Sequence, residues 1–199
     1  MPVCDGCGLR ADEAHITSRN ERIELAARYR PAQIKVLFLD ACPPAKVEDF
    51  FYSAGKDRSA RSVASRSYFD ELVKTLGGES GATTREDNSL VEFRRKRFFV
   101  SYGVECPCAG DAELTSALRR LAPTVMKRVQ YSLQPEYVVP IGAQTRELIR
   151  LFGLIGWGDR LILDKGGPFV DPYFGDPQKQ ATQGTAFGTR LAKILEALP

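Results

Sequence analysis

Apolar residues occur along this chain in two patterns, and each predicts a different kind of element. Short, nearly unbroken apolar runs cover residues 34–39, 98–104 and 137–141, which is typical of strands buried on both faces. Apolar residues spaced by three or four positions predict helices over 18–29, 67–76, 111–133, 143–152 and 185–198. Residues 90–97 are predicted as a short helix or irregular segment, and 155–163 as a connection or a further strand.

The order of these elements predicts the fold. Strands that alternate with helices form parallel sheets covered by helices on both faces. We therefore predict an α/β fold with three α/β/α layers around a central, mostly parallel four-stranded sheet. A chain of 199 residues suffices for a single domain over 1–199, with one core and no second large domain.

The predicted strands all end in turn residues. The first run is followed by Asp40-Ala41-Cys42-Pro43-Pro44, the second by Cys106-Pro107, and the third ends at Gly142. Open α/β sheets bind their ligands beyond the carboxyl ends of the strands. We therefore expect the functional residues to lie at these turns.

Charge and composition indicate which kinds of partner the protein could bind. The net charge of +3 and the pI of about 8.6 are only mildly basic, but arginines cluster, as at Arg94-Arg95-Lys96-Arg97. Such clusters suit phosphate contacts or simply a solvated surface. No apolar run approaches the roughly 20 residues that span a membrane, and the first residues lack the layout of a signal peptide. We therefore expect a cytoplasmic protein that does not bind membranes.

A pair of cysteines marks the N-terminal segment. Cys4-Asp5-Gly6-Cys7 forms a turn-rich Cys-x-x-Cys knuckle, which is a good signature for metal binding. Disulfides are rare in the cytosol, so the five cysteines are expected to be metal-bound or reduced. The sequence predicts a metal-binding knuckle over residues 1–16.

Six short motifs follow one another along the chain. In sequence order these are Cys4-Asp5-Gly6-Cys7-Gly8-Leu9, the strand ending at Asp40–Pro44, Phe50-Phe51-Tyr52, Val104-Glu105-Cys106-Pro107, Pro135–Gly142, and Asp171-Pro172-Tyr173 before the last helix. Their order and spacing resemble the iron–sulfur class of the uracil-DNA glycosylase superfamily. The resemblance covers nearly the whole chain, and its strength lies in the order of motifs that are individually weak.

The resemblance implies an activity and a partner. Glycosylases of this superfamily are hydrolases of DNA base-excision repair, and they break the N-glycosidic bond of a base flipped out of the DNA stack. By this resemblance we expect a monomeric DNA glycosylase that acts on uracil or another deaminated or damaged base, in single- or double-stranded DNA.

The chain departs from the family at several positions of the pocket. Asp40 stands where the family has the glycine of its first motif, Ala41 where it has glutamate, and Cys42 where the most active members keep the catalytic aspartate. Tyr102 lies near the asparagine that reads the uracil edge, and Asp171 replaces a histidine that contacts the base. These departures put strict uracil specificity, and catalysis itself, in question.

Candidate roles follow from the needs of the chemistry. A carboxylate can position water and stabilise the cationic sugar, and polar groups can stabilise the departing base. Asp40 is the first candidate acid, with a turn-forming role as the alternative, and Glu48 and Asp49 follow, with solvated loop acids as theirs. The candidates for binding the base are Ala41, Phe51, Tyr52, Tyr102 and Asp171. Phe51 or Tyr52 would stack on the base, and the alternative is that both are buried in the core. The candidates for binding DNA are Pro43, Pro44, Tyr173, Phe174, Gly175, Gln178 and Lys179.

The resemblance adds further candidates to the set of metal ligands. Cys106 matches the third cluster cysteine of the family, while the fourth family cysteine is missing, and Cys108 and His15 are its possible substitutes. Three thiolates and a histidine suit tetrahedral zinc, and four thiolates suit zinc or an iron–sulfur (4Fe–4S) cluster. We expect a structural metal held by Cys4, Cys7, Cys106 and one of these substitutes, with zinc narrowly preferred.

Two other functions remain open from the sequence alone. The altered motifs favour a non-catalytic member that binds nucleic acid or a free nucleobase. A flavodoxin-like module that binds a small nucleotide or a partner protein fits the same element order. Loss of DNA binding even at low salt would favour the second of these, because phosphate contacts make affinity strongly salt-dependent.

Overall fold

The computed structural model describes residues 1–53, 60–74, 86–169 and 177–198 of the chain. Its centre is a parallel sheet of three strands, β1 (Val36–Asp40), β2 (Phe98–Tyr102) and β3 (Tyr137–Pro140), in the order β2-β1-β3. β1 pairs with both neighbours, so that Phe38 lies opposite Val100 on one side and Val139 on the other. Every residue of β1 is buried, as the unbroken apolar run predicts.

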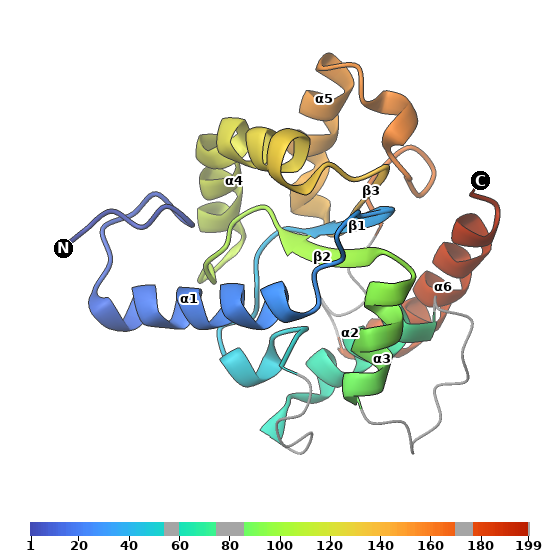
Figure 1. The fold of residues 1–199 in the computed structure, drawn as a ribbon, viewed down its shortest axis with the longest axis horizontal. Helices are drawn as coiled ribbons and strands as arrows, with labels where there is room; N and C mark the ends of the chain where they lie inside the picture. Colours follow the sequence, from blue (N-terminus) through green and yellow to red (C-terminus); the bar gives the residue numbers. More distant parts are fainter. Residues whose placement is uncertain (54–59, 75–85, 170–176, 199) are drawn as a thin grey trace.

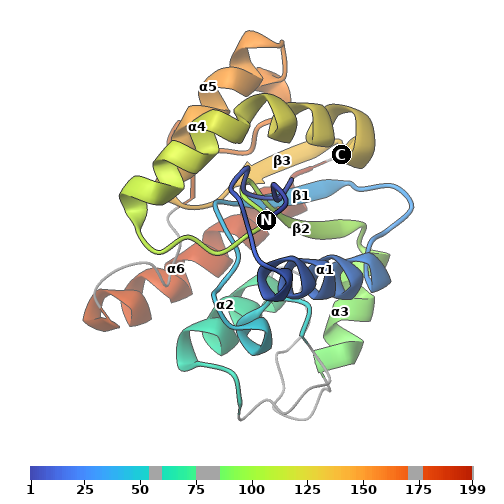
Figure 2. The same ribbon diagram turned by 90° about the vertical axis from the view of Figure 1, so that its left-hand side faces the viewer.

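Helices cover both faces of the sheet and confirm the predicted layers. Figures 1 and 2 show α4 (Asp111–Lys127) and α5 (Arg146–Leu154) on one side, and α1 (Glu13–Arg28), α2 (Val63–Lys74) and α3 (Glu86–Arg95) on the other. α4 continues as a π-helical turn over Arg128–Leu133, and α6 (Pro177–Glu196) packs against α2. Short 3-10 turns span Val47–Asp49, Ala143–Thr145 and Gly158–Arg160. None of the helices in the described residues combines the length and apolar character that a membrane span needs.

The predicted fourth strand is not found among the described residues. Instead, the segment 161–169 touches β3 at two separate points: Ile162 donates to the Val138 carbonyl at 2.9 Å, and Phe169 donates to the Pro140 carbonyl at 2.9 Å. Between these contacts a tight turn, with Lys165 and Gly166 at φ of 53° and 81°, leads the chain away from the sheet. The segment therefore makes isolated bridges rather than a strand.

In the part of the chain that the structure describes, side chains rather than another strand satisfy the free edge of β2. The Val100 N–H donates to the Tyr52 hydroxyl at 2.7 Å, and that hydroxyl donates to the Val100 carbonyl at 3.1 Å. Arg128 donates to the Tyr102 carbonyl further along the same edge. Buried backbone groups at a sheet edge must find partners, and here Tyr52 and Arg128 supply them.

α1 begins earlier than the apolar spacing predicts. The Asp12 carboxylate accepts a hydrogen bond from the His15 backbone N–H at 2.8 Å and so caps the helix, which starts at Glu13 instead of residue 18. The additional turn places His15, Arg19 and Arg22 on one face, because residues four and seven positions apart lie on the same side of a helix. This face of α1 is directed at the site described next.

Candidate functional site

Four side chains form a cluster that could hold a metal ion. They are Cys4, Cys7, His15 and Cys106, and their ligand atoms all lie within 4.8 Å of one another. Cys4 Sγ and Cys106 Sγ are 3.5 Å apart, and His15 Nε2 lies 3.2 Å from Cys106 Sγ and 3.6 Å from Cys7 Sγ. Metal–ligand bonds of about 2.3 Å to sulfur and 2.0–2.1 Å to nitrogen place tetrahedral donors about 3.5–3.8 Å apart. The donor types and spacings therefore fit a metal ion without large rearrangement.

The N-terminal knuckle is shaped by tight backbone turns. The Gly8 N–H donates to the Cys4 carbonyl at 2.7 Å, and Gly8 adopts a φ of +70°, which favours glycine. Gly6 approaches the cluster so closely that a Cβ there would lie 3.1 Å from Cys106 Sγ and 2.4 Å from Arg19 Nε. The Gly6 carbonyl also accepts from the Glu105 N–H at 3.0 Å. The knuckle is thus joined directly to the segment that follows β2.

The surroundings of the cluster act in opposite directions on two of its thiols, because burial raises the pKa of Cys106 whereas the pKa of Cys4 is lowered. Burial acts to raise the pKa of Cys4, but hydrogen bonds from the Gly6 backbone and the Cys106 and Cys7 groups hold it below its ordinary value. Burial also opposes the charge of Arg19, yet its pKa is raised, because Glu105 and the thiols of Cys4 and Cys106 stabilise the guanidinium. Three thiolates, a neutral histidine and a divalent ion would carry a net charge of about −1.

Arginines are placed to balance that charge. Glu105 is bound by Arg19 at 2.6 Å and by Arg128 at 2.5 Å, and Arg120 donates to the Cys7 carbonyl at 2.8 Å. These contacts link the knuckle, α1, the segment after β2 and α4. A metal at this point would join elements that are far apart in the sequence.

Of the two proposed substitutes for the fourth ligand, His15 joins the cluster and Cys108 does not. The Cys108 thiol points to the Cys106 carbonyl, at 3.9 Å, and lies beside Cys42 in a separate pocket.

That separate pocket, called here the strand-end pocket, lies beyond the carboxyl ends of β1 and β2. It is a cavity of about 270 Å³. Residues predicted for catalysis, base binding or DNA binding that line it are Asp40, Pro43, Pro44, Asp49, Phe51 and Tyr102. The other lining residues are Cys108, which was predicted as a metal ligand, and Cys42, Ala45, Ser62, Ala64, Ser65 and Tyr68. Residues predicted from separate motifs thus meet in one place, as the rule for parallel sheets requires.

Asp40 and Tyr102 form the floor of the strand-end pocket. The two residues pair across β1 and β2, and Asp40 is only 9% exposed. One Asp40 carboxylate oxygen accepts from the Ala41 N–H at 2.6 Å. Burial, and secondarily the charge of Asp40, hold the pKa of Tyr102 well above its ordinary value, so the phenol stays protonated. The floor therefore combines a carboxylate with a neutral hydroxyl donor.

The thiol of Cys42 is held protonated at the same pocket. Burial raises its pKa to about 12, and the charge of Asp40 acts in the same direction. A thiol is a far weaker nucleophile than a thiolate. Cys42 is therefore a poor candidate for covalent chemistry here.

Other predicted residues have different surroundings. Asp49 lines the pocket, but its carboxylate accepts from the Ser62 N–H at 2.6 Å, just before α2 begins. Glu48 and Ala41 do not line the pocket. Phe51 and Tyr52 are each 1% exposed, and the Tyr52 hydroxyl is occupied by the edge of β2. The aromatic triplet thus packs mainly within the core.

The predicted C-terminal loop cannot be placed against the pocket. Asp171, Tyr173, Phe174 and Gly175 lie outside the described residues, and Gln178 and Lys179 lie in the first turn of α6. Tyr68 and Ser65 of α2 were missed by the sequence analysis, since an aromatic and a serine on an amphipathic helix carry no distinctive signal. Arg22 and Arg128 were also missed, although the spacing of Arg22 from His15 marks the same helix face.

Comparison with known protein families, with curated proteins and with solved structures finds no match to this chain.

Proposed function

We propose that this protein is a DNA glycosylase that removes a damaged base in the strand-end pocket, with Asp40 as the acting carboxylate. The observation that supports this most is the shared floor of Asp40 and Tyr102 at the carboxyl ends of paired parallel strands. A cavity of about 270 Å³ lies just below the usual range of about 300–1,000 Å³ for drug-sized ligands. A flat heterocycle the size of a nucleobase suits this volume.

The pocket offers both groups that cleavage of an N-glycosidic bond needs. The Asp40 carboxylate, with one oxygen bonded to the Ala41 N–H, would orient a water molecule and stabilise positive charge on the sugar. The protonated Tyr102 would donate a hydrogen bond to the base as negative charge develops on it. Phe51 and Tyr68 supply the aromatic wall against which the base would pack.

We also propose that the metal is zinc with a structural role. Three thiolates and one imidazole complete a tetrahedral site, which leaves no position for substrate. The donor set contains three cysteines and one histidine, whereas 4Fe–4S clusters are held by cysteines. When bound, zinc would supply a cross-link between the knuckle, α1 and the segment after β2. Elemental analysis should find one zinc per chain, whereas iron with acid-labile sulfide would refute this assignment.

The activity can be tested with labelled oligonucleotides. Strands that carry uracil, hypoxanthine, xanthine or only normal bases would be incubated with the metal-loaded protein and then treated with alkali to cut abasic sites. We expect cleavage of a damaged strand and a loss of at least about 100-fold in Asp40→Asn. The matched control is Asp159→Asn, which alters an exposed carboxylate in the turn Gly158–Arg160.

Two results would contradict the proposal. Equal rates for Asp40→Asn and the wild type would exclude Asp40 as the acting group. No cleavage of any strand by folded, metal-loaded protein that still binds the oligonucleotides would replace the glycosylase with a binding-only member of the same fold.

A further inference from the structure

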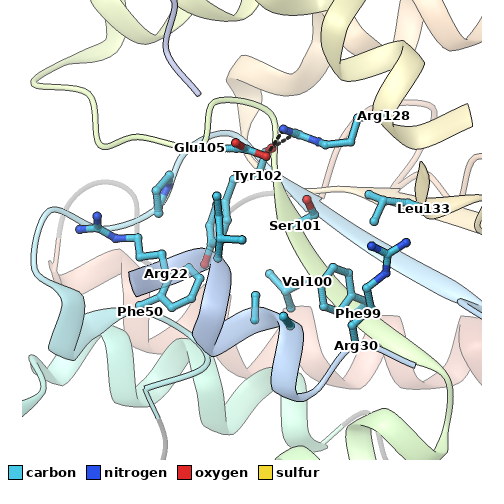
Figure 3. Close-up of a pocket in the computed structure, with 14 residues that line it drawn as sticks. Arg22, Arg30, Phe50, Phe99, Val100, Ser101, Tyr102, Glu105, Arg128 and Leu133 are labelled. Carbon is cyan, nitrogen blue, oxygen red and sulfur yellow. Dashed lines mark hydrogen bonds and ion pairs between the residues drawn. The ribbon is translucent and has the colours of Figure 1, made fainter. Parts of the chain in front are cut away.

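The charged side chains near Tyr102 are distributed unequally between two cavities. Tyr102 and Pro43 line both the strand-end pocket and a second cavity of about 180 Å³. Figure 3 shows Arg22, Arg30 and Arg128 around the second cavity, where each guanidinium group donates to oxygen atoms of the protein. Among the described residues, by contrast, no lysine, arginine or histidine lines the strand-end pocket.

Two carboxylates line the strand-end pocket instead. Asp40 lies on its floor at the end of β1, and Asp49 lies in its wall, where it accepts from the Ser62 N–H at 2.6 Å. A carboxylate can accept about four hydrogen bonds, so the bond from Ser62 leaves acceptor sites on Asp49. The lining therefore offers negative charge and hydrogen-bond acceptors to a ligand.

The charge of Asp40 acts on other groups of the pocket. Burial is the main reason that the pKa of Cys42 is raised to about 12 and that of Tyr102 well above its ordinary value, and the charge of Asp40 acts in the same direction on both. Arg61, a buried arginine that donates to the Ser65 hydroxyl behind this lining, opposes Asp40 at Tyr102 with the smaller effect. The floor of the pocket therefore favours positive over negative charge.

Aromatic rings complete the lining. Phe51, Tyr68 and Tyr102 all line the pocket, and the rings of Phe51 and Tyr68 meet edge to face with their centroids 6.3 Å apart. Aromatic rings attract cations through the negative charge density of their faces. A flat cation would therefore gain packing, cation–π attraction and attraction to the carboxylates together, whereas a neutral base would gain the packing alone.

We propose that the strand-end pocket takes a base with a fixed positive charge, a purine alkylated on a ring nitrogen, in preference to neutral uracil or hypoxanthine. This inference rests on the glycosylase function proposed above and names its substrate class. The flipped base would pack against Tyr68, with Asp40 and Asp49 close to its positive charge.

The reaction of such a base suits the groups that line the pocket. The C1′–N9 bond breaks and its electron pair goes to the base, which leaves as a neutral molecule. Water held by Asp40 bonds to C1′, and its proton passes through the carboxylate to solvent. The cationic nucleotide and water thus give an abasic site, a neutral base and H⁺. A neutral base would instead leave as an anion beside two carboxylates, without a cation among the described lining residues to balance it.

Free nucleosides test the charge preference separately from catalysis. The probe is 7-methylguanosine, which is cationic at pH 6, and guanosine is its neutral counterpart. Calorimetric titration of the metal-loaded protein should show at least about tenfold tighter binding of 7-methylguanosine. Asp49→Asn keeps an acceptor for the Ser62 N–H but removes the charge, so it should reduce this ratio at least about threefold. The matched control is Asp159→Asn, an exposed position outside the pocket, which should keep the ratio.

Excision from DNA tests the substrate itself. Oligonucleotides with a single 7-methylguanine, uracil or hypoxanthine would be incubated with the metal-loaded protein. The released base would be measured by mass spectrometry, because alkali itself cleaves strands at 7-methylguanine, and release without protein would be subtracted. We expect 7-methylguanine to be released at least about tenfold faster than either neutral base, and Asp49→Asn to narrow this ratio. Comparison of the bases by the wild type requires no variant, so it stays decisive if Asp49→Asn is unstable.

The outcomes distinguish this inference from the proposed activity. Release of uracil or hypoxanthine at least as fast as 7-methylguanine would overturn the charge preference and leave the glycosylase in place. Preferred binding of 7-methylguanosine without release of any base would remove the glycosylase and support the cation site. Equal binding of the two nucleosides, or the same ratio in Asp49→Asn and Asp159→Asn, would overturn the inference.

Discussion

Replacement of Arg22 by methionine should destabilise the protein and loosen the loop beside the strand-end pocket. Arg22 extends from α1 and donates to the Pro44 carbonyl at 3.2 Å and to the Ala45 carbonyl at 2.7 Å. These are contacts between a helix and a loop more than 20 positions away in sequence. The loop that lines the strand-end pocket is thus held by a helix that also carries His15 of the candidate metal cluster.

The size of the effect can be worked from these contacts. A hydrogen bond that involves a charged group contributes about 1.5–3 kcal/mol, so the two bonds to the loop contribute about 3–6 kcal/mol together. The substitution also removes a buried charge and an Nε–H that has no acceptor, both of which are costly to bury. Removing this cost offsets part of the stability lost with the two hydrogen bonds. We expect a net loss of about 2–3 kcal/mol in the free energy of unfolding.

Urea denaturation of the metal-loaded protein measures this loss. With a slope of about 2 kcal/mol per molar, the midpoint should fall by about 1–1.5 M. The matched control is Arg28→Met, an exposed arginine on the same helix, which should stay within about 0.5 kcal/mol of the wild type. A second readout is local, because a loosened loop should make Cys42 react faster with a thiol reagent. An unfolding free energy for Arg22→Met equal to that of the control would refute the role assigned to Arg22.

Three further predictions concern other parts of the structure. Tyr52→Phe removes both hydrogen bonds to Val100 at the edge of β2 and should lower the free energy of unfolding by about 1–3 kcal/mol. Urea denaturation would measure this loss, and an unchanged value would show that the edge finds other hydrogen-bond partners. Cys108→Ser should leave the metal content and affinity unchanged, because His15 supplies the fourth donor; loss of metal in elemental analysis would contradict the assignment. Alkylation of Cys42 by iodoacetamide, followed by mass spectrometry, should be at least about 100-fold slower in the folded protein than in urea. The reason is that a pKa of about 12 leaves little of the Cys42 thiol as thiolate. The alkylation rate of the folded protein should therefore still rise tenfold per pH unit at pH 9–10, and a plateau there would contradict the raised pKa.

The sequence predicted part of the candidate metal cluster but not all of its members. The Cys4-x-x-Cys7 spacing is a local signal, and it indicated a metal site because two cysteines so placed can both face one ion. The remaining donors, His15 and Cys106, are 91 positions apart, and only the packing of α1 against the segment after β2 brings them to 3.2 Å. The choice between His15 and Cys108 was therefore open until the tertiary structure was known.

The strand-end pocket was also predictable only in part. Parallel strands bring their carboxyl ends together whatever their sequence distance, so Asp40 and Tyr102 were expected to be neighbours. The aromatic triplet was less predictable, because a run of aromatics is equally suited to a core and to a binding surface. Tyr52 is used to satisfy Val100 at the sheet edge, a need that arises only once the edge exists.

The sequence by itself determined the kinds of elements, because strand and helix periodicity depend on neighbouring residues: three buried strands, the helices between them and the parallel sheet were all readable from it. Only the tertiary structure decided how the sheet ends, which side chains complete the candidate metal cluster, and which carbonyl and carboxylate groups the buried arginines contact. These features depend on contacts between Arg22, Arg128, Tyr52 and His15 and segments far away in the chain, whose geometry no local pattern encodes.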